Sequence, residues 1–185
     1  MRMFIFIIAS IIPLLLISAE FYEGENLITP YSLNTDDWEI LKREEGPLKS
    51  MMWRSKDKGI ADTYAVHVYL GVNHNSAVVR EKQDAPGEKS CEMFESYELD
   101  PIPNKNYKSL MWRTVCEINS DFVAQILHLV IEGKGSTYHL QKIWRGETTD
   151  YEINKWIEIF RDVYVCDSRV ENKQCPSGYE KVRDV

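Results

Sequence analysis

The stretch that decides the fold is FVAQILHLVIE-GKGS-TYHLQKIW, residues 122–144. Two runs rich in aliphatic and aromatic residues flank a short segment with two glycines, a pattern that predicts an antiparallel hairpin. A register in which Gly133 faces Ser136 puts five apolar side chains on one face, because strand side chains alternate between the two faces of a sheet. These side chains are Leu127, Leu129, Ile131, Tyr138 and Leu140.

The segment TDYEINKWIEIFRDV, residues 149–163, follows the hairpin and predicts a helix. Thr149 is suited to cap its N-terminus, and Glu152 three positions later completes a capping box. Five apolar residues recur at helical spacing and form one stripe, which needs a sheet face to cover. The stripe comprises Ile153, Trp156, Ile157, Phe160 and Val163.

The rest of the chain predicts more strands and little helix. Residues 91–99 fit a strand or a helical turn equally well, residues 77–82 predict a short helix, and residues 84–87 with Pro86 predict a loop. Three further segments have the composition and alternation of strands. They are residues 50–55, 63–72 and 109–118.

Asp36 and Asp37 precede Trp38, and this order predicts the cap of a short helix over residues 38–41, which ends at EEGP, residues 44–47. Taken together, the strands lie first and last, short turns join them, and one long helix lies near the C-terminus. The sequence therefore predicts an α+β fold. Its mainly antiparallel sheet carries one long C-terminal amphipathic helix packed on one face.

Residues 1–19 have the anatomy of a secretory signal peptide. Arg2 supplies a positive start, an apolar run follows, and Ala19 provides a small side chain at the end. The apolar run, about 15 residues, is short for a membrane span of about 20 residues. We expect cleavage after Ala19, which leaves residues 20–185 as a single exported domain, periplasmic or secreted, with no membrane association.

The four cysteines all follow the predicted signal peptide, and an even number in an exported chain predicts disulfides. We expect the pairs Cys91–Cys116 and Cys166–Cys175, because each joins cysteines close in sequence. Each bridge would contribute about 3 kcal/mol through chain entropy. The wide spacing argues against a zinc site, and a redox Cys-x-x-Cys motif is absent.

The composition limits the classes of function. The chain is 44% apolar and 28% charged, which excludes a disordered or collagen-like protein. Its 22 basic and 29 acidic residues give a net charge of −7, and removal of Arg2 with the signal peptide would make it more negative by one. An acidic chain without a basic patch repels phosphate backbones, so we expect no nucleic-acid partner.

The dipeptide Trp-Arg occurs three times, each on or beside a predicted strand. One interpretation is that the three pairs line one partner-binding surface, since Trp and Arg are favoured anchors of interfaces. The other is that the tryptophans face the core and the neighbouring arginines face solvent. The residues are Trp53, Arg54, Trp112, Arg113, Trp144 and Arg145.

His128 and His139 form the best candidate chemical site. The predicted register makes them diagonal neighbours on one face of the hairpin, beside Gln141. Their functional interpretation is a metal or acid–base site, and the alternative is a partly buried polar sheet face. A third ligand is missing, and no motif of a hydrolase or a phosphate-binding enzyme occurs. We therefore predict no catalytic residue, no cofactor and no metal.

Residues 124–167 contain a long strand, a glycine turn, a second strand that ends in KIWRG (residues 142–146), and a capped amphipathic helix. This layout resembles the C-terminal half of small exported α/β domains of the photosystem-extrinsic, PsbP-like kind. Bacterial periplasmic immunity proteins of contact-dependent secretion systems are sometimes built on similar small domains. The resemblance covers about a quarter of the chain and implies a non-enzymatic binding domain, without assigning any residue a role.

Three hypotheses about function follow. The first is an exported, non-enzymatic protein that binds a protein partner with a basic surface, in its most specific form an immunity or inhibitor protein for a secreted toxin. The second is a small-ligand or lipid-binding accessory domain of the cell envelope. The third is an exported enzyme centred on His128 and His139. The oligomeric state stays open.

Overall fold

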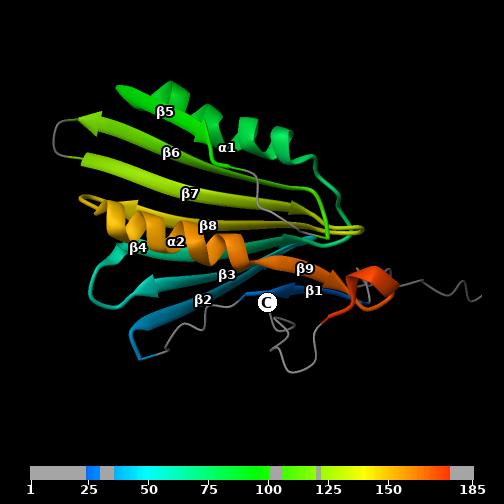
Figure 1. The fold of residues 1–185 in the computed structure, drawn as a ribbon. Helices are drawn as coiled ribbons and strands as arrows, with labels where there is room; N and C mark the ends of the chain where they lie inside the picture. Colours follow the sequence, from blue (N-terminus) through cyan, green and yellow to red (C-terminus); the bar gives the residue numbers. More distant parts are fainter. Residues whose placement is uncertain (1–23, 30–35, 101–105, 120–121, 176–185) are drawn as a thin grey trace, which may run out of the picture.

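The computed structural model describes residues 24–29, 36–100, 106–119 and 122–175 (Figure 1). The predicted signal peptide, residues 1–19, lies outside these ranges. Nine strands occur in the described residues, and all of their pairings are antiparallel. This confirms the mainly antiparallel sheet predicted from the short turns.

Seven strands form the main sheet in the order β2-β3-β4-β8-β7-β6-β5 (Figure 1). Two short strands, β1 (Glu25–Ile28) and β9 (Tyr164–Asp167), form a separate two-stranded sheet. β9 directly follows the C-terminal helix in the chain. The strands of the main sheet are β2 (Trp38–Glu45), β3 (Leu48–Ser55), β4 (Gly59–Tyr69), β5 (Met93–Glu98), β6 (Ser109–Asn119), β7 (Phe122–Glu132) and β8 (Thr137–Arg145).

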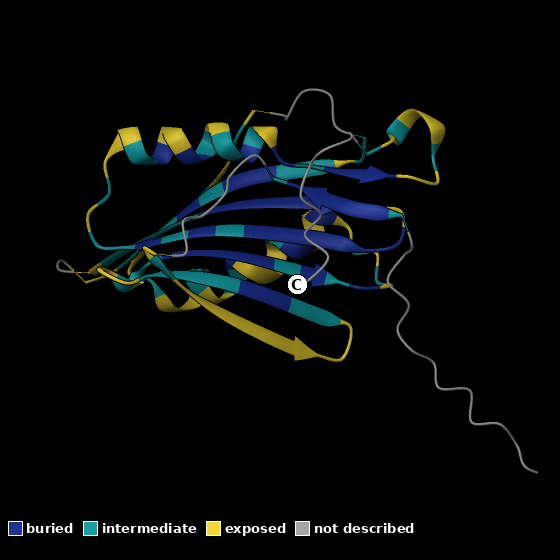
Figure 2. Cartoon of the chain, turned by 90° about the horizontal axis from the view of Figure 1, so that it is seen from below, coloured by how far each residue is buried: buried dark blue, intermediate teal, exposed yellow. Residues whose placement is uncertain are grey.

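The central hairpin has the predicted register. Leu129 pairs with Leu140 and Ile131 pairs with Tyr138, and all four side chains are buried. β7 and β8 lie in the middle of the sheet, and both helices contact β7. Figure 2 shows this part of the sheet as the most buried.

Two helices cover opposite faces of the sheet, where the sequence predicts one long helix. The first, α1 (Ser76–Ser90), has 15 residues and packs against β5, β6 and β7. The second, α2 (Asp150–Asp162), has 13 residues and carries the predicted capping box between Thr149 and Glu152. The prediction of a single long helix is therefore wrong, because the described residues contain two helices. The C-terminal helix, α2, is also the shorter of the two. A single 3₁₀ turn, Glu171–Lys173, follows β9.

The predicted loop at residues 84–87 is wrong, because α1 continues through Pro86. Tertiary contacts compensate for the helix-breaking residue. The Asp84 carboxylate inside the helix accepts hydrogen bonds from Trp112 and Ser96 on the sheet. Gly87 allows the last turn to approach β5 closely, since a Cβ at this position would lie 2.4 Å from the Phe94 ring. Packing on the sheet thus overrides local propensity.

The predicted short helix over residues 38–41 is also wrong, because these residues begin strand β2. The segment EEGP, taken as the end of a helix, instead contains the last two residues of β2 and the two-residue turn Gly46-Pro47 that leads into β3. Gly46 adopts the positive φ of 56° that such a turn needs. The pairing with β3 decides the conformation here. Asp36 and Asp37 are residues that favour a helix N-cap, and the strand pairing overrides this local preference.

The face under α2 holds the main hydrophobic core. Ile153, Trp156 and Phe160 are buried there against Tyr64 of β4 and Leu140 of β8. The face under α1 holds a smaller apolar cluster made by Val79, Trp112 and Val130. Polar groups therefore occupy more of the α1 face, and they are described below.

Both predicted disulfides form, and all four cysteines are paired. Cys91–Cys116 fastens the end of α1 to β6, with 5.4 Å between the Cα atoms, and Cys166–Cys175 closes the segment after β9, with 5.0 Å. In the described part of the chain no helix is long and apolar enough to cross a membrane.

Candidate functional site

The three Trp-Arg pairs do not share one surface, which corrects the first interpretation of this repeat. Trp112 lies on the α1 face and is fully buried, and its indole N–H donates to Asp84 Oδ1 at 3.1 Å. Trp144 is buried on the opposite face, and half-buried Trp53 stacks there on Tyr64. The core-facing alternative therefore describes Trp112 and Trp144.

The arginines of these pairs make contacts within the chain. Arg54 pairs with Glu39, Arg113 donates to Gln125 and lies 5.7 Å from the centre of the Tyr97 ring, and Arg145 donates to the Ile60 carbonyl. Each arginine thus has a nearby acceptor. No shared anchor site connects the three.

The predicted proximity of His128 and His139 is confirmed, and a third histidine joins them. His128 Nδ1 lies 3.2 Å from His139 Nε2, and Gln141 Nε2 lies 3.3 Å from the same His128 nitrogen. His67 on β4 lies opposite His139 and bonds Gln141 Oε1 through Nε2 at 3.1 Å. Ser50 on β3 completes the chain of hydrogen bonds with a 2.8 Å contact to His67 Nδ1. We call His67, His128, His139 and Gln141 the histidine cluster.

The Trp112 ring covers the cluster from the side of β6. It stacks on His128 with 4.3 Å between ring centroids and an angle of 3° between the planes. His128 and His139 are each only 1% exposed. Burial and the Arg80 guanidinium lower the pKa of His128 to about 3. Burial and the neighbouring imidazoles keep the pKa of His139 well below its usual range, and burial also lowers the pKa of His67.

Neutral imidazoles that are buried from solvent favour the second interpretation given above, in which these residues form a polar sheet face under α1 and not a metal or acid–base site. No imidazole of the pair is presented to solvent where a substrate would bind. Among the described residues, no group of three or more His, Cys, Asp or Glu side chains could hold a metal ion. The cluster is best understood as a hydrogen-bonded layer between α1 and the sheet.

Lys142 is a buried charge that the sequence reading missed. It is 1% exposed, pairs with Asp62, and its Nζ lies 4.7 Å from the centre of the Trp156 ring. Trp38 and Trp144 provide two more ring faces, at 5.1 and 5.4 Å. Burial lowers the pKa of Lys142, while Asp62 favours its charged form. Strand alternation was the available signal, because position 142 shares a face with buried Leu140 and Trp144.

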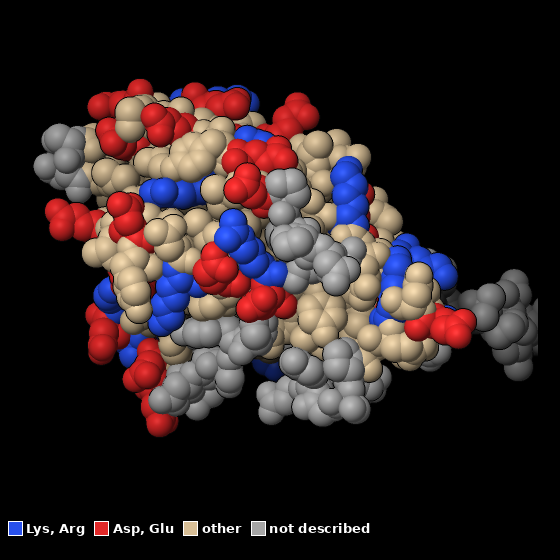
Figure 3. All heavy atoms as spheres, viewed as in Figure 1, with Lys and Arg blue, Asp and Glu red and all other residues tan. Residues whose placement is uncertain are grey.

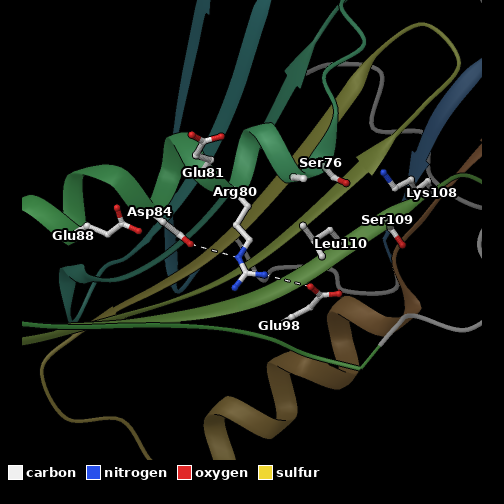
Figure 4. Close-up of a pocket in the computed structure, with 10 residues that line it drawn as sticks. Ser76, Arg80, Glu81, Asp84, Glu88, Glu98, Lys108, Ser109 and Leu110 are labelled. Carbon is white, nitrogen blue, oxygen red and sulfur yellow. Dashed lines mark hydrogen bonds and ion pairs between the residues drawn. The ribbon is translucent and has the colours of Figure 1, made fainter.

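A surface groove of about 420 Å³ lies between α1 and the β5–β6 edge of the sheet (Figure 4). Arg80 projects from α1 toward its middle and joins Asp84 on the helix to Glu98 on β5, at 3.5 and 3.3 Å. Ten residues line the groove: Ser76, Ala77, Arg80, Glu81, Asp84, Glu88, Glu98, Lys108, Ser109 and Leu110. Four carboxylates and two basic groups make it acidic.

The groove lies in an acidic part of the chain. Residues 80–100 contain seven acidic and three basic residues, so a net charge of −4 of the total −7 falls in this segment. Figure 3 shows acidic side chains along the edge of the molecule that α1 and β5 occupy in Figure 1, and further acidic side chains over the rest of the same face. We call α1 and β5 together the acidic edge. Nothing in the sequence motifs pointed to it, although the local charge count would have.

Comparison of the chain with models of known protein families and with curated proteins gives no match.

Proposed function

We propose that this chain is an exported, non-enzymatic binding protein, and that its acidic edge engages a basic surface of a protein partner. An immunity or inhibitor protein for a secreted toxin is the most specific form of the proposal. The observation that carries it is the concentration of carboxylates on α1 and β5 around an open groove. Complementary charge accelerates encounter and orients the partner, which suits a protein that must neutralise another one quickly.

Two further observations support export. The apolar leader ends in small residues, and the four cysteines form two disulfides, which persist in oxidising compartments. The most polar alternative site, the histidine cluster, is closed from solvent. An acidic protein surface is thus the better candidate for function.

The acidic edge separates into inner and outer carboxylates, and this determines the experiment. Asp84 is 6% exposed and holds the fold together, whereas Glu81, Glu88 and Glu98 line the groove and face solvent. The outer three can therefore be replaced by glutamine without removing a buried hydrogen bond of Asp84. The tagged protein and this triple variant would be used to capture partners from envelope extract of the source cells.

We expect the wild-type protein to retain a specific partner that is released by salt, because exposed charge pairs are screened. The triple variant should bind that partner at least about tenfold more weakly, about 1.4 kcal/mol. A matched control removes three exposed carboxylates from the other side of the chain: Glu147→Gln, Glu158→Gln and Asp162→Asn. An equal loss of binding affinity in both variants would contradict the proposal. So would a partner whose capture does not depend on salt concentration.

A further inference from the structure

Strand β2 is an outer strand of the main sheet and pairs, among the described residues, only with β3. Seven of its eight residues are exposed, and Figure 2 shows it as the exposed strand at the margin of the sheet. Ile40 and Leu41 are 41% and 40% exposed. An outer strand of this length is a template for pairing with another strand.

The hydrogen bonds toward β3 determine which residues point outward. Lys56 N–H donates to the Asp37 carbonyl at 2.9 Å, so the ladder with β3 continues through Asp37. Residues along an antiparallel strand alternate between bonding one neighbour and bonding the other. The odd-numbered residues of β2 therefore bond β3, and Ile40 and Glu44 direct their backbone groups to the outer edge. A second antiparallel strand completes a ladder only where even-numbered residues face even-numbered ones.

Two long registers between two copies of β2 satisfy this condition. With the two-fold axis at Leu41, Glu39 of each copy faces Arg43 of the other, and Leu41 faces itself. With the axis at Lys42, that lysine faces itself and Glu39 faces Glu45. Opposite charges directly across a pair stabilise a sheet and like charges destabilise it. The first register pairs opposite charges on both sides of its axis and has one like-charged pair, Asp37 opposite Glu45, at each end. The second register has like charges at its axis and at the Glu39–Glu45 pairs, so only the first brings Glu39 opposite an arginine.

The intrachain partners extend this complementarity. Glu39 already pairs with Arg54 on β3, and Arg43 already pairs with Glu45 at 2.5 Å. In the Leu41-centred register both pairs would join the reciprocal Glu39–Arg43 contacts in one network of alternating sign. The other outer strand, β5, cannot do the same, because its charged residues, Glu95 and Glu98, are all acidic.

We propose that two copies of the chain associate through antiparallel pairing of their β2 strands, with the two-fold axis at Leu41 and reciprocal Glu39–Arg43 ion pairs. The two main sheets then form one continuous sheet, and the acidic edges lie at its two far ends. This dimer is independent of the binding function proposed above.

Sedimentation velocity of the protein tests the proposal. Protein concentrations from about 1 to about 100 µM detect a dimer with a dissociation constant in the micromolar range. We expect a dimer that weakens with salt. Arg43→Glu or Glu39→Arg alone should raise the dissociation constant at least about tenfold, and the double charge swap should restore it. Glu147→Arg, an equal charge reversal far from β2 in sequence, should leave dimerisation unchanged.

Ile40→Pro provides a second test that keeps the fold. Proline removes a backbone N–H that points to the outer edge, and such positions on edge strands tolerate proline. The variant should stay folded by circular dichroism and become monomeric. A wild-type protein that is monomeric throughout, single reversals without effect, or a double swap that fails to rescue would overturn the proposal. So would long polymers, since they indicate pairing of β2 with β5 instead.

Discussion

The histidine cluster should make the protein lose stability in mild acid. In the folded chain burial lowers the pKa of His128, helped by Arg80, to about 3, and it keeps the pKa of His139 well below the ordinary value of 6.5. The unfolded chain has ordinary histidines. Between these pKa values the unfolded state binds protons that the folded state does not, so stability falls as the pH falls below about 6.5.

The expected loss follows from the size of the pKa difference. At about pH 5 an ordinary histidine is about 1.5 pH units below its pKa, which corresponds to about 2 kcal/mol per group. His128 should therefore cost about 2 kcal/mol between about pH 7 and pH 5, and His139 adds to this loss because its pKa is also lowered. His67 adds to this loss, because burial lowers its pKa too. Against a typical total of about 5–15 kcal/mol, the loss is large.

Urea unfolding followed by tryptophan fluorescence, at about pH 7, 6 and 5, measures this dependence. Paired carboxylates do not contribute to the pH dependence in this range, because their contribution to the stability of the fold is lost only at lower pH. For example, hydrogen bonds from Arg169 lower the pKa of Asp167 to about 2, so its contribution begins to disappear only below the ordinary Asp value of 3.8. His128→Gln should remove about 2 kcal/mol of the pH dependence. A free energy of unfolding that is flat from pH 7 to pH 5 would refute the assignment of neutral, buried imidazoles.

Four further predictions concern stability and covalent structure. Trp156→Ala should destabilise the fold by about 3–5 kcal/mol, because it empties a large buried site, and a thermal midpoint like that of the wild type would contradict the core assignment. Thr149→Ala should cost about 1 kcal/mol in urea unfolding through loss of the helix cap. Asp62→Asn should cost about 3 kcal/mol or more, because it leaves the buried Lys142 ammonium without its carboxylate, whereas an unchanged midpoint would mean that the pair is solvated. Thiol titration of the native protein should find no reactive cysteine before reduction.

The hairpin and the C-terminal helix could be predicted because their signals are local. The two glycines set the turn, and alternation from that turn sets the register that brings Leu129 opposite Leu140. The capping box between Thr149 and Glu152 spans three residues, and the apolar stripe follows directly. Where neighbouring residues alone decide a conformation, sequence reasoning reaches the residue level.

The misassigned segments take their conformation from hydrogen bonds to other elements rather than from their own residues. Trp38 begins a strand because β3 supplies the hydrogen bonds, and α1 continues past Pro86 because Asp84 bonds Trp112 and Ser96. The pairing of β8 with β4 has the same character, since it joins strands distant in sequence and brings His67 to His139. A hairpin register locates His128 near His139, but no local pattern states which strand lies on the other side of β8.

The acidic edge combines a structural carboxylate with functional candidates, and the two can be distinguished by their surroundings. Asp84 accepts hydrogen bonds from Trp112 and Ser96 and pairs with Arg80, so its loss would leave a buried indole N–H without an acceptor. Glu81 and Glu88 lie on the same helix but are exposed. A change at Asp84 that weakens partner binding would therefore lower the thermal midpoint as well. A change at Glu81 and Glu88 should weaken binding and leave the midpoint in place, and only that combination assigns a binding role to the charge of this edge.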